Sequence, residues 1–376
     1  MKQKPYLALG LMSGTSMDGV DASIIRSNGE DEYETILDRY FEYDDEIYQE
    51  LINIRDKIST TKDLITYSDS ITNLEKKITL FHSIISKKVL GQSSLEVDLI
   101  GFHGQTILHN VDKKISRQLG DANLLSNLLK KKVVYNFRHN YIANEGQGAP
   151  LAPIFHQLLV NQNNIKLPAC ILNIGGIANI TVVPSNKSID LKSCDIGPGN
   201  CLLDEWVRKK IKKKYDTNGE IAKLGKTSKI IFNLAIDNFN TIKKKNNTSF
   251  DVKDFDLNFV RDLSLEDGLS TLTDFTGTII AEAIVDSIII KKDEVLNVLV
   301  CGGGRKNLTL LNDIKKNFPN YININLIDDY KINGDFVESQ AFAYLAIRSY
   351  LKLPISFPQT TGVKAPCRGG ILVKNY

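Results

Sequence analysis

Short apolar runs joined by a glycine-rich turn open the chain. Residues 6–11 have the length and composition of a buried strand, and residues 20–25 form a second run of the same kind. The segment between them therefore joins two strands, which predicts a hairpin. Residues 33–43 continue as a third and more polar strand. The chain thus begins with three strands that follow one another directly.

Helical spacing of apolar positions follows these strands. It runs through residues 44–91, where apolar side chains recur at intervals of three and four. Residues 97–102 and 133–135 again resemble buried strands, and a short helix is expected to begin at residues 120–123. Strands and helices that alternate after an antiparallel start predict an α/β sheet, antiparallel at one end and parallel at the other.

The same order of elements begins again at residue 169. A strand at 169–174, a glycine turn and a returning strand at 177–183 repeat the layout of residues 6–25. The elements predicted after them are a third strand from 189–191 and 194–196, helices over 200–213 and 269–290, strands at 295–301 and 322–327, and a closing helix over 337–351. The same order of predicted elements in both halves of the chain indicates a duplication. Two such halves are expected to form two lobes with a cleft between them, and the expected ligand of that cleft is a nucleotide.

Length and charge narrow the class of protein. A chain of 376 residues is expected to form two domains, and the glycine- and proline-containing stretch at 145–150 is the expected boundary. The first lobe would span 1–145, joined by 352–376, and the second 146–351. A net charge of +3 argues against nucleic-acid and membrane partners. Five scattered cysteines, a first apolar run without a cleavage site and the lack of a membrane-length apolar stretch predict a cytoplasmic protein.

The first glycine turn is the strongest candidate for phosphate binding. Its backbone N–H groups and the hydroxyls of Thr15 and Ser16 can point at one anion, while Asp18 and Asp21 can hold the water shell of a metal ion. The turn carries no Gly-Lys-Ser/Thr and opens no helix, which excludes a Walker-type loop. An ordinary hairpin turn is the alternative. Further glycine turns that follow buried strands lie at Gly175-Gly176, Gly197-Pro198-Gly199 and Gly302-Gly303-Gly304.

Asp195 is the candidate general base, because it ends a strand just before a glycine turn, where a carboxylate is held rigidly. The alternative is a capping role for the helix that begins near Asn200. By spacing alone, Glu338 is a residue of a helix cap. His103 and His109 belong to no set with zinc-ligand spacing, so any metal is expected to be magnesium carried by a nucleotide rather than held in a protein cage.

Taken together, these motifs resemble the anhydro-N-acetylmuramic acid kinase family over nearly the whole chain. The matching stretches are Leu11-Met12-Ser13-Gly14-Thr15-Ser16-Met17-Asp18-Gly19-Val20-Asp21, Gly104-Gln105-Thr106, Gly146-Gln147-Gly148-Ala149-Pro150-Leu151, Asn173-Ile174-Gly175-Gly176-Ile177-Ala178-Asn179, Asp195-Ile196-Gly197-Pro198-Gly199-Asn200, Cys301-Gly302-Gly303-Gly304, Glu338-Ser339-Gln340-Ala341-Phe342-Ala343 and Pro358-Gln359-Thr360-Thr361-Gly362-Val363. The resemblance implies a two-lobed actin-like ATPase (ribonuclease H-like) fold with a nucleotide cleft between the lobes.

The resemblance also implies a reaction. ATP, water and 1,6-anhydro-N-acetylmuramate would give N-acetylmuramate 6-phosphate and ADP, in the recycling of peptidoglycan. Asp195 would activate the attacking water, and Glu338, Gln147 and Asn179 would bind the sugar. The residues implied for ATP are Gly14, Thr15, Ser16, Met17, Asp18, Gly19, Val20, Asp21, Gly175, Gly176, Gly302, Gly303 and Gly304. The implied cofactors are ATP and Mg²⁺, with the ion near Asp18 or Asp21, and the implied assembly is a homodimer.

Two stretches depart from the pattern of the family. Tyr141 stands where the family has an aspartate, Glu145 stands where it has a glycine, and residues 246–249 replace a Pro-Pro-Lys-Ser stretch. These changes leave open a kinase for another sugar or amino sugar on the same fold. A non-catalytic sensor of sugar or nucleotide is the alternative from a different class of protein.

Overall fold

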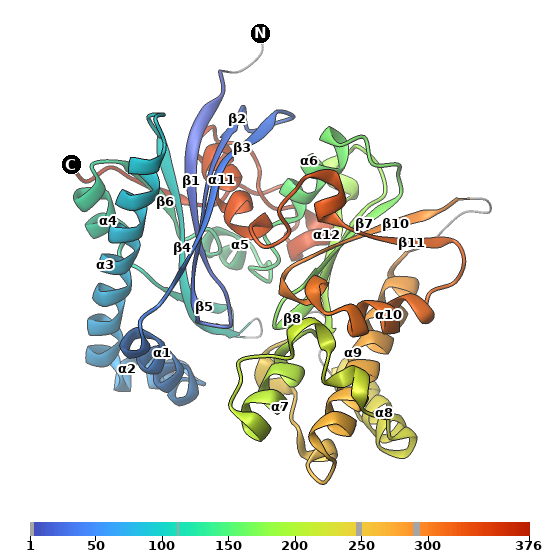
Figure 1. Cartoon of the computed structure of the whole chain (residues 1–376). Coiled ribbons are helices and arrows are strands. Elements are labelled where there is room, and N and C mark those ends of the chain that lie inside the picture. Colours follow the sequence, from blue (N-terminus) through green and yellow to red (C-terminus); the bar gives the residue numbers. More distant parts are fainter. Residues whose placement is uncertain (1–3, 111–112, 246–249, 289–293) are drawn as a thin grey trace. The chain divides into compact units, whose positions relative to one another are not determined.

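The computed structural model describes residues 4–110, 113–245, 250–288 and 294–376. These residues form two compact units (Figure 1). The first unit comprises residues 1–164, 186–191 and 336–376, and the second comprises residues 165–185 and 192–335. Each unit is built on one sheet. In the part of the chain that the structure describes, no helix is both long and apolar enough to cross a membrane.

The sheet of the first unit is mixed. Its strands are β1 (Tyr6–Ser13), β2 (Gly19–Ser27), β3 (Tyr33–Glu42), β4 (Leu99–Asn110), β5 (Ile115–Leu119), β6 (Lys132–Tyr135) and β12 (Ile371–Val373). They lie in the order β12-β6-β4-β1-β2-β3, with β5 paired to β4. β1, β2 and β3 are antiparallel, whereas β4 runs parallel to β1 and β6 parallel to β4. The prediction of a sheet that is antiparallel at one end and parallel at the other is confirmed.

Helices cover both faces of this sheet. They are α1 (Asp45–Lys57), α2 (Thr61–Thr66), α3 (Ser68–Gln92), α4 (Ala122–Leu129), α5 (His139–Ala143), α6 (Pro153–Gln162), α11 (Val337–Tyr350) and α12 (Pro358–Thr361). The core contains α1 and α3 residues at helical spacing, such as Leu51, Leu74 and Ile78, packed with strand residues. α11 packs on the opposite face against β1, β2 and β4. A Cβ at Gly10 or Gly101 would collide with the backbone of α11, so glycine is required for this close approach.

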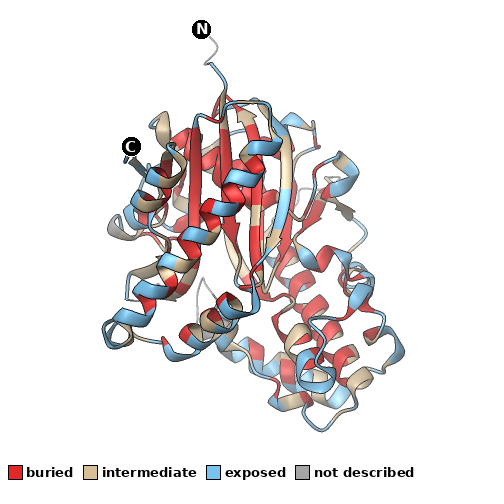
Figure 2. Ribbon diagram, turned by 60° about the vertical axis from the view of Figure 1, so that its left-hand side comes forward, coloured by how far each residue is buried: buried red, intermediate tan, exposed pale blue. Residues whose placement is uncertain are grey.

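The second unit repeats the strand order of the first. Its strands are β7 (Ala169–Ile174), β8 (Ile177–Val183), β9 (Lys192–Pro198), β10 (Leu296–Cys301) and β11 (Ile322–Leu326), in the order β11-β10-β7-β8-β9. Its helices are α7 (Cys201–Ile211), α8 (Lys229–Lys245), α9 (Leu265–Ser287) and α10 (Leu308–Lys316). Alternate strand residues pack against α9 and α10 in one apolar core. The central strands are deeply buried, while several helices carry exposed residues along one face (Figure 2).

Several predicted boundaries are wrong in detail. Residues 189–191 are not a strand: Ser188–Asp190 form a 3₁₀ turn, and β9 begins at Lys192. β4 continues past residue 102 because it forms a hairpin with β5 that the apolar pattern does not indicate. The long helix begins earlier than predicted, at Leu265, and positions 289–290 of its predicted end lie outside the described residues. Other 3₁₀ turns lie at Thr217–Gly219, Ala222–Leu224, Val252–Asp254, Asn258–Val260, Gly303–Lys306 and Ile327–Tyr330.

The compact units divide the chain at other places than the predicted lobes. Residues 146–164 and 336–351 belong to the first unit. The physical reason is clearest for α11, because its apolar residues complete the core over β1, β2 and β4. The segment that carries Glu338 is therefore part of the first unit.

Candidate active site

The first glycine turn joins β1 to β2 and presents its polar tip to solvent. Thr15 and Ser16 are exposed, and the Ser16 hydroxyl donates to Oδ1 of Asp18 over 2.5 Å. Met17 is buried and has a φ of 58°, an uncommon conformation for a residue with a side chain. Its N–H donates to the carbonyl of Gly14 over 3.2 Å. Buried Met17 therefore anchors the turn while the two hydroxyl residues stay at its tip.

Buried polar side chains support this turn from behind. The Ser13 hydroxyl lies 2.9 Å from the Tyr43 hydroxyl and 3.4 Å from Nε2 of His82. Nδ1 of His82 lies 2.8 Å from the carbonyl of Ile78, so Nδ1–H donates there and Nε2 is an acceptor. Burial lowers the pKa of His82 to about 4, so the ring is neutral at pH 7. Gln105 donates from Nε2 to the carbonyl of Gly14 over 2.9 Å.

Acidic side chains gather on the β2 side of the turn. The pKa of Tyr40 is raised by burial and, in addition, by the negative charges of Asp18, Glu42 and Asp21. These three carboxylates therefore lie close enough to one phenol to influence it. Within the described ranges, no group of three or more His, Cys, Asp or Glu residues has the arrangement of a metal site.

Glycine turns of the second unit are joined by backbone hydrogen bonds. Gly175-Gly176 connects β7 to β8, and its carbonyls accept from the N–H groups of Gly199, Asn200 and Cys201 over 2.8–3.2 Å. The Asn200 side chain also donates to the carbonyl of Ile174 over 3.2 Å. The start of α7 is thereby fixed to the tip of the β7–β8 hairpin.

Asp195 lies on β9, at the edge of the second sheet, beside a β-bulge. Asn179 pairs with Asp195 and Ala178 pairs with Gly197, which leaves Ile196 as the extra residue. Bulges re-aim neighbouring side chains and are common beside active sites. One carboxylate oxygen, Oδ2, accepts from the N–H of Phe250 over 3.2 Å. The capping alternative for Asp195 is wrong, because the N-cap position of α7 is Asn200.

Polar side chains form a row with Asp195 across the second sheet. Asn173 on β7 pairs with Asn179 on β8, and Asn179 pairs with Asp195 on β9. Directly paired residues of antiparallel strands project from the same face. The residues that alternate with them, such as Leu172 and Ile180, belong to the apolar core with α9 and α10. The structure thus brings Asn179 and Asp195, two of the predicted site residues, side by side on the other face.

An ion-pair network holds the glycine turn at residues 302–304. The Arg305 side chain is only 6% exposed; it binds Asp328 over 2.7 Å and Asp335 over 2.6 Å. It also donates to the carbonyl of Gly302 over 3.2 Å. Burial acts to raise the pKa of both carboxyl groups, but the hydrogen bonds and charge of Arg305 outweigh it, and both pKa values are lowered. Sequence reasoning missed Arg305, although it directly follows the glycines.

The predicted ATP-binding glycines fall into two groups. A Cβ at Gly14, Gly175 or Gly303 would find no protein atom within 3.4 Å, so the protein leaves room for a side chain at these positions. A Cβ at Gly19, Gly302 or Gly304 would instead collide with Phe41, Asn173 or Ile174, respectively. The first group fits close approach by a ligand, whereas the second group is required by the packing of the protein itself.

Glu338 lies in the first turn of α11 and is half-buried. The next two residues anchor that turn to the sheet of the first unit. The Ser339 hydroxyl lies 2.7 Å from that of Ser23, and the Gln340 amide donates to both oxygens of Asp38 over 3.0 and 3.1 Å. Burial raises the pKa of Asp38, and the hydrogen bonds that Ser23 and Gln340 donate to its carboxylate partly offset the effect. The helical turn that carries Glu338 is thus fixed by contacts that spacing alone does not reveal.

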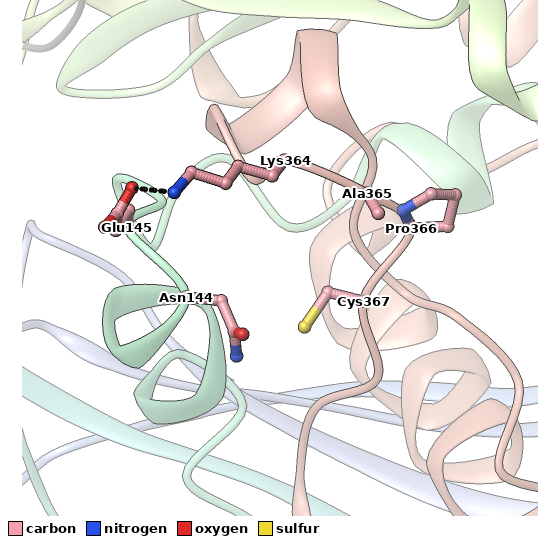
Figure 3. A pocket seen from close by; sticks show the side chains of 6 residues that line it. All are labelled: Asn144, Glu145, Lys364, Ala365, Pro366 and Cys367. Atoms are coloured by element: carbon pink, nitrogen blue, oxygen red, sulfur yellow. Dashed lines mark ion pairs between the residues drawn. The ribbon is translucent and has the colours of Figure 1, made fainter.

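Two of the three departures from the family pattern lie in the described residues and can be placed in the structure. Tyr141 is fully buried, and its hydroxyl packs against the backbone at Gly369, so it is a core residue. Glu145 has a φ of 65° and forms an ion pair with Lys364 over 2.8 Å. That pair borders a pocket of about 300 Å³ lined by Asn144, Glu145, Lys364, Ala365, Pro366 and Cys367 (Figure 3). The third departure, at residues 246–249, lies outside the described residues.

The remaining predicted residues belong to the first unit. Gln147 is half-buried, and its N–H donates to the carbonyl of Thr361 over 2.6 Å. Val20 is a buried residue of β2, and Asp21 pairs across the sheet with Met12 and Tyr40. Sequence reasoning also missed the supporting residues Ser13, Tyr43, His82 and Asn200. Ser13 and Asn200 lie inside recognised motifs, whereas helical spacing alone gives no sign of a role for His82.

Two α/β units with the same strand order, each opening on a glycine hairpin, have the architecture that the resemblance to the kinase family implies. A sequence model of the family described as anhydro-N-acetylmuramic acid kinase matches residues 6–375. The chain belongs to this family. It is therefore a kinase, and membership implies ATP and a sugar as its substrates.

Individual relatives agree with the match to the family. A protein named anhydro-N-acetylmuramic acid kinase from Pelagibacter ubique is 63% identical over 374 residues and covers 100% of both chains. A protein of the same name from Zymomonas mobilis is 36% identical and covers 97% of this chain and 98% of its own. The similarity is thus not confined to the glycine turns but extends through both units.

Proposed function

We propose that the protein opens the anhydro bridge of 1,6-anhydro-N-acetylmuramate with water and phosphorylates the released O6 with ATP. The products are N-acetylmuramate 6-phosphate and ADP, and the reaction belongs to cell-wall recycling. The observation that carries the proposal is 63% identity over the full chain to a relative of that name. A cytoplasmic location and a homodimer complete the proposal; they follow from composition and family resemblance.

In the proposed reaction Asp195 is the general base. It removes a proton from the attacking water, which adds to the anomeric carbon while the bond to O6 breaks. O6 then takes the γ-phosphoryl group. A base must be held firmly in one direction to act efficiently. The bulge at Ile196 and the hydrogen bond from Phe250 to Oδ2 support this role for Asp195.

ATP is proposed to bind through the glycine turns of both units. Backbone N–H groups near Gly14, Gly175 and Gly303 would approach its phosphates, and the space at these glycines supports the role. Thr15 and Ser16 would add hydroxyl donors, and Asp18 or Asp21 would contact the water shell of Mg²⁺. The ion would neutralise charge on the phosphates, as in other phosphoryl transfers. Glu338, Gln147 and Asn179 are proposed to bind the sugar.

ADP release in oxygen-18 water tests the proposal. With 1,6-anhydro-N-acetylmuramate as substrate, we expect ADP and a 6-phosphorylated sugar that carries the heavy oxygen at its anomeric hydroxyl. Label at that position would support attack by water at the anomeric carbon. Phosphorylation of an ordinary hexose or amino sugar, with no ADP formed from the anhydro sugar, would overturn the substrate assignment. No ADP with any sugar would favour a sensor.

A further inference from the structure

Tyr43 is hydrogen-bonded to both flanks of the first glycine turn. Its N–H donates to the carbonyl of Asp18 over 2.9 Å, and its hydroxyl lies 2.9 Å from that of Ser13. Ser13 is the last residue of β1, and Asp18 directly precedes β2. Tyr43 itself directly follows β3, a third strand of the same sheet. One residue therefore fixes the two points between which residues 14–17 form the turn.

The hydrogen bond of the Tyr43 hydroxyl has a defined direction. Because Nδ1–H of His82 donates to the carbonyl of Ile78, Nε2 of His82 can only accept, and the Ser13 hydroxyl lies 3.4 Å from it. The single proton of Ser13 is then used for His82, so the Tyr43 hydroxyl donates to Ser13. Burial raises the pKa of Tyr43 and lowers that of His82, which keeps Tyr43 a donor and His82 an acceptor at neutral pH. Tyr43, Ser13 and His82 thus form one directed chain of hydrogen bonds.

Aromatic packing holds this chain in place. The Tyr43 ring centroid lies 4.9 Å from that of Phe81 on α3, and the His82 ring centroid lies 5.0 Å from that of Phe102 on β4. Tyr43 is 4% exposed and Ser13 is 1% exposed, so water does not compete for either hydroxyl. A hydrogen bond in such a place is costly to break, because the groups left behind remain buried without a partner. The chain therefore connects the turn firmly to α3 and β4.

We propose that Tyr43 is a positioning residue for ATP, because its hydroxyl holds the first glycine turn in the conformation that receives the phosphates. The inference rests on the proposed role of this turn in ATP binding. A turn that contains glycine has many accessible conformations, and ordering it at the moment of binding would cost free energy. The buried chain orders the turn beforehand, so Tyr43 acts without touching ATP. Phosphoryl transfer depends chiefly on positioning, and loss of this order should therefore affect both ATP affinity and rate.

Removal of the Tyr43 hydroxyl tests this assignment. Tyr43→Phe keeps the ring and deletes only the donor, and we expect calorimetry to show about tenfold weaker binding of ATP. With 1,6-anhydro-N-acetylmuramate as the second substrate, kcat/KM for ATP should fall by at least the same factor, whereas KM for the sugar should stay within about twofold. Ser13→Ala should cause a similar loss. Because both variants break the same chain, the double variant should bind ATP no more than about twofold more weakly than Ser13→Ala alone.

Tyr344 offers the matched control. It is a buried tyrosine of the same unit, and its hydroxyl donates over 2.9 Å to the carbonyl of Glu30, which lies beyond the opposite end of β2. Tyr344→Phe should lower the melting temperature at least as much as Tyr43→Phe, but it should change ATP affinity by less than about twofold. Equal losses of ATP affinity in the two variants, or no loss in Tyr43→Phe, would show that Tyr43 is only structural. Additive losses in the double variant would show that Tyr43 does not act through Ser13.

Two further outcomes separate this inference from the proposed function. If Tyr43→Phe does not fold, Ser13→Ala decides, and an ATP affinity equal to that of the unmodified protein would refute the inference. Calorimetry with ATP needs no sugar, so it tests Tyr43 in the same way when the anhydro sugar yields no ADP and only the proposed substrate fails. An unmodified protein that binds no ATP would overturn the proposed role of the turn and this inference with it.

Discussion

The two units hold their first glycine hairpins in different ways. In the first unit, buried side chains lie behind the turn: Ser13 contacts Tyr43 and His82, and Gln105 binds the carbonyl of Gly14. In the second unit, the carbonyls of Gly175 and Gly176 accept from backbone N–H groups at the start of α7. The same strand order therefore allows a glycine hairpin to be held either by side chains or by backbone hydrogen bonds. We expect the side-chain support to be more sensitive to pH and to substitution.

The largest expected difference between the two units is the loss of stability of the first unit at acidic pH. All five histidines lie in the first unit, and burial lowers the pKa of four of them, to about 4 for His82 and His109 and about 3 for His103 and His156. These groups bind protons in the unfolded chain before the folded one, so their stabilisation is complete above about pH 6.5 and is lost as pH falls towards 4. At pH 5 each should cost about 2 kcal/mol of the free energy of unfolding.

Hydrogen exchange measured separately for β1–β4 and β7–β10 at pH 7 and pH 5 checks this prediction. After correction for intrinsic exchange rates, protection should fall further in the first unit than in the second. The lowered carboxyl pKa values of Asp328 and Asp335 act in a lower window, below about pH 4. Equal losses of protection in both units would contradict the prediction that the first unit is more sensitive to acid.

Removal of the proposed base should have the next largest effect. Asp195→Asn keeps the shape of the side chain but cannot accept a proton, and we expect kcat to fall about 10²- to 10⁴-fold. ATP affinity, measured by calorimetry, should stay within about twofold, because the glycine turns are unchanged. Glu338→Gln, in the first unit, should act mainly on KM for the sugar. A kcat close to that of the unmodified enzyme in Asp195→Asn would show that the chemistry lies elsewhere.

Alanine substitutions at two neighbouring glycines of the second unit should affect different properties, stability in one case and ATP affinity in the other. A methyl group at Gly304 collides with Ile174, so Gly304→Ala should lower the free energy of unfolding by about 1–3 kcal/mol. At Gly303 the closest atom would be Nδ2 of Asn200 at 3.8 Å, so Gly303→Ala should fold normally. Its ATP affinity should fall about tenfold, equivalent to about 1.4 kcal/mol, if the backbone approaches phosphates. Denaturant unfolding and nucleotide titration measure the two quantities. Normal ATP affinity in Gly303→Ala would argue against a phosphate contact there.

The smallest predicted effect concerns Glu145. Its φ of 65° is disfavoured for a residue with a side chain, so Glu145→Gly should raise the melting temperature by about 2 °C. Glu145→Gln keeps the same backbone conformation but removes the ion pair with Lys364. Because that pair is exposed, the melting temperature of this control should hardly change. A lower melting temperature for the glycine variant would show that the ion pair outweighs the backbone strain.

Much of the fold could be predicted because local patterns carry it. Apolar runs bounded by glycine located β1, β2, β7, β8 and β10, and helical spacing located α3, α9 and α11. The hairpin of β4 and β5 was not predicted because the residues of β5 are mostly only partly buried, and its apolar and polar positions do not alternate cleanly. Residues 189–191 were wrongly predicted as a strand because the alternating apolar residues Ile189 and Leu191 resemble one. Periodicity reports burial, and it is weak wherever an element is short or only half-buried.

The sequence by itself determined the order of the elements, the positions of the glycine turns and the family to which the chain belongs. These features depend on neighbours along the chain, and a few residues suffice to encode them. Only the tertiary structure decided which glycines have room for a side chain, that a bulge lies beside Asp195, and that Arg138 bonds to Gly148 and His103. Each of these depends on contacts between segments distant in sequence, and such contacts are decided by the packing of the whole unit.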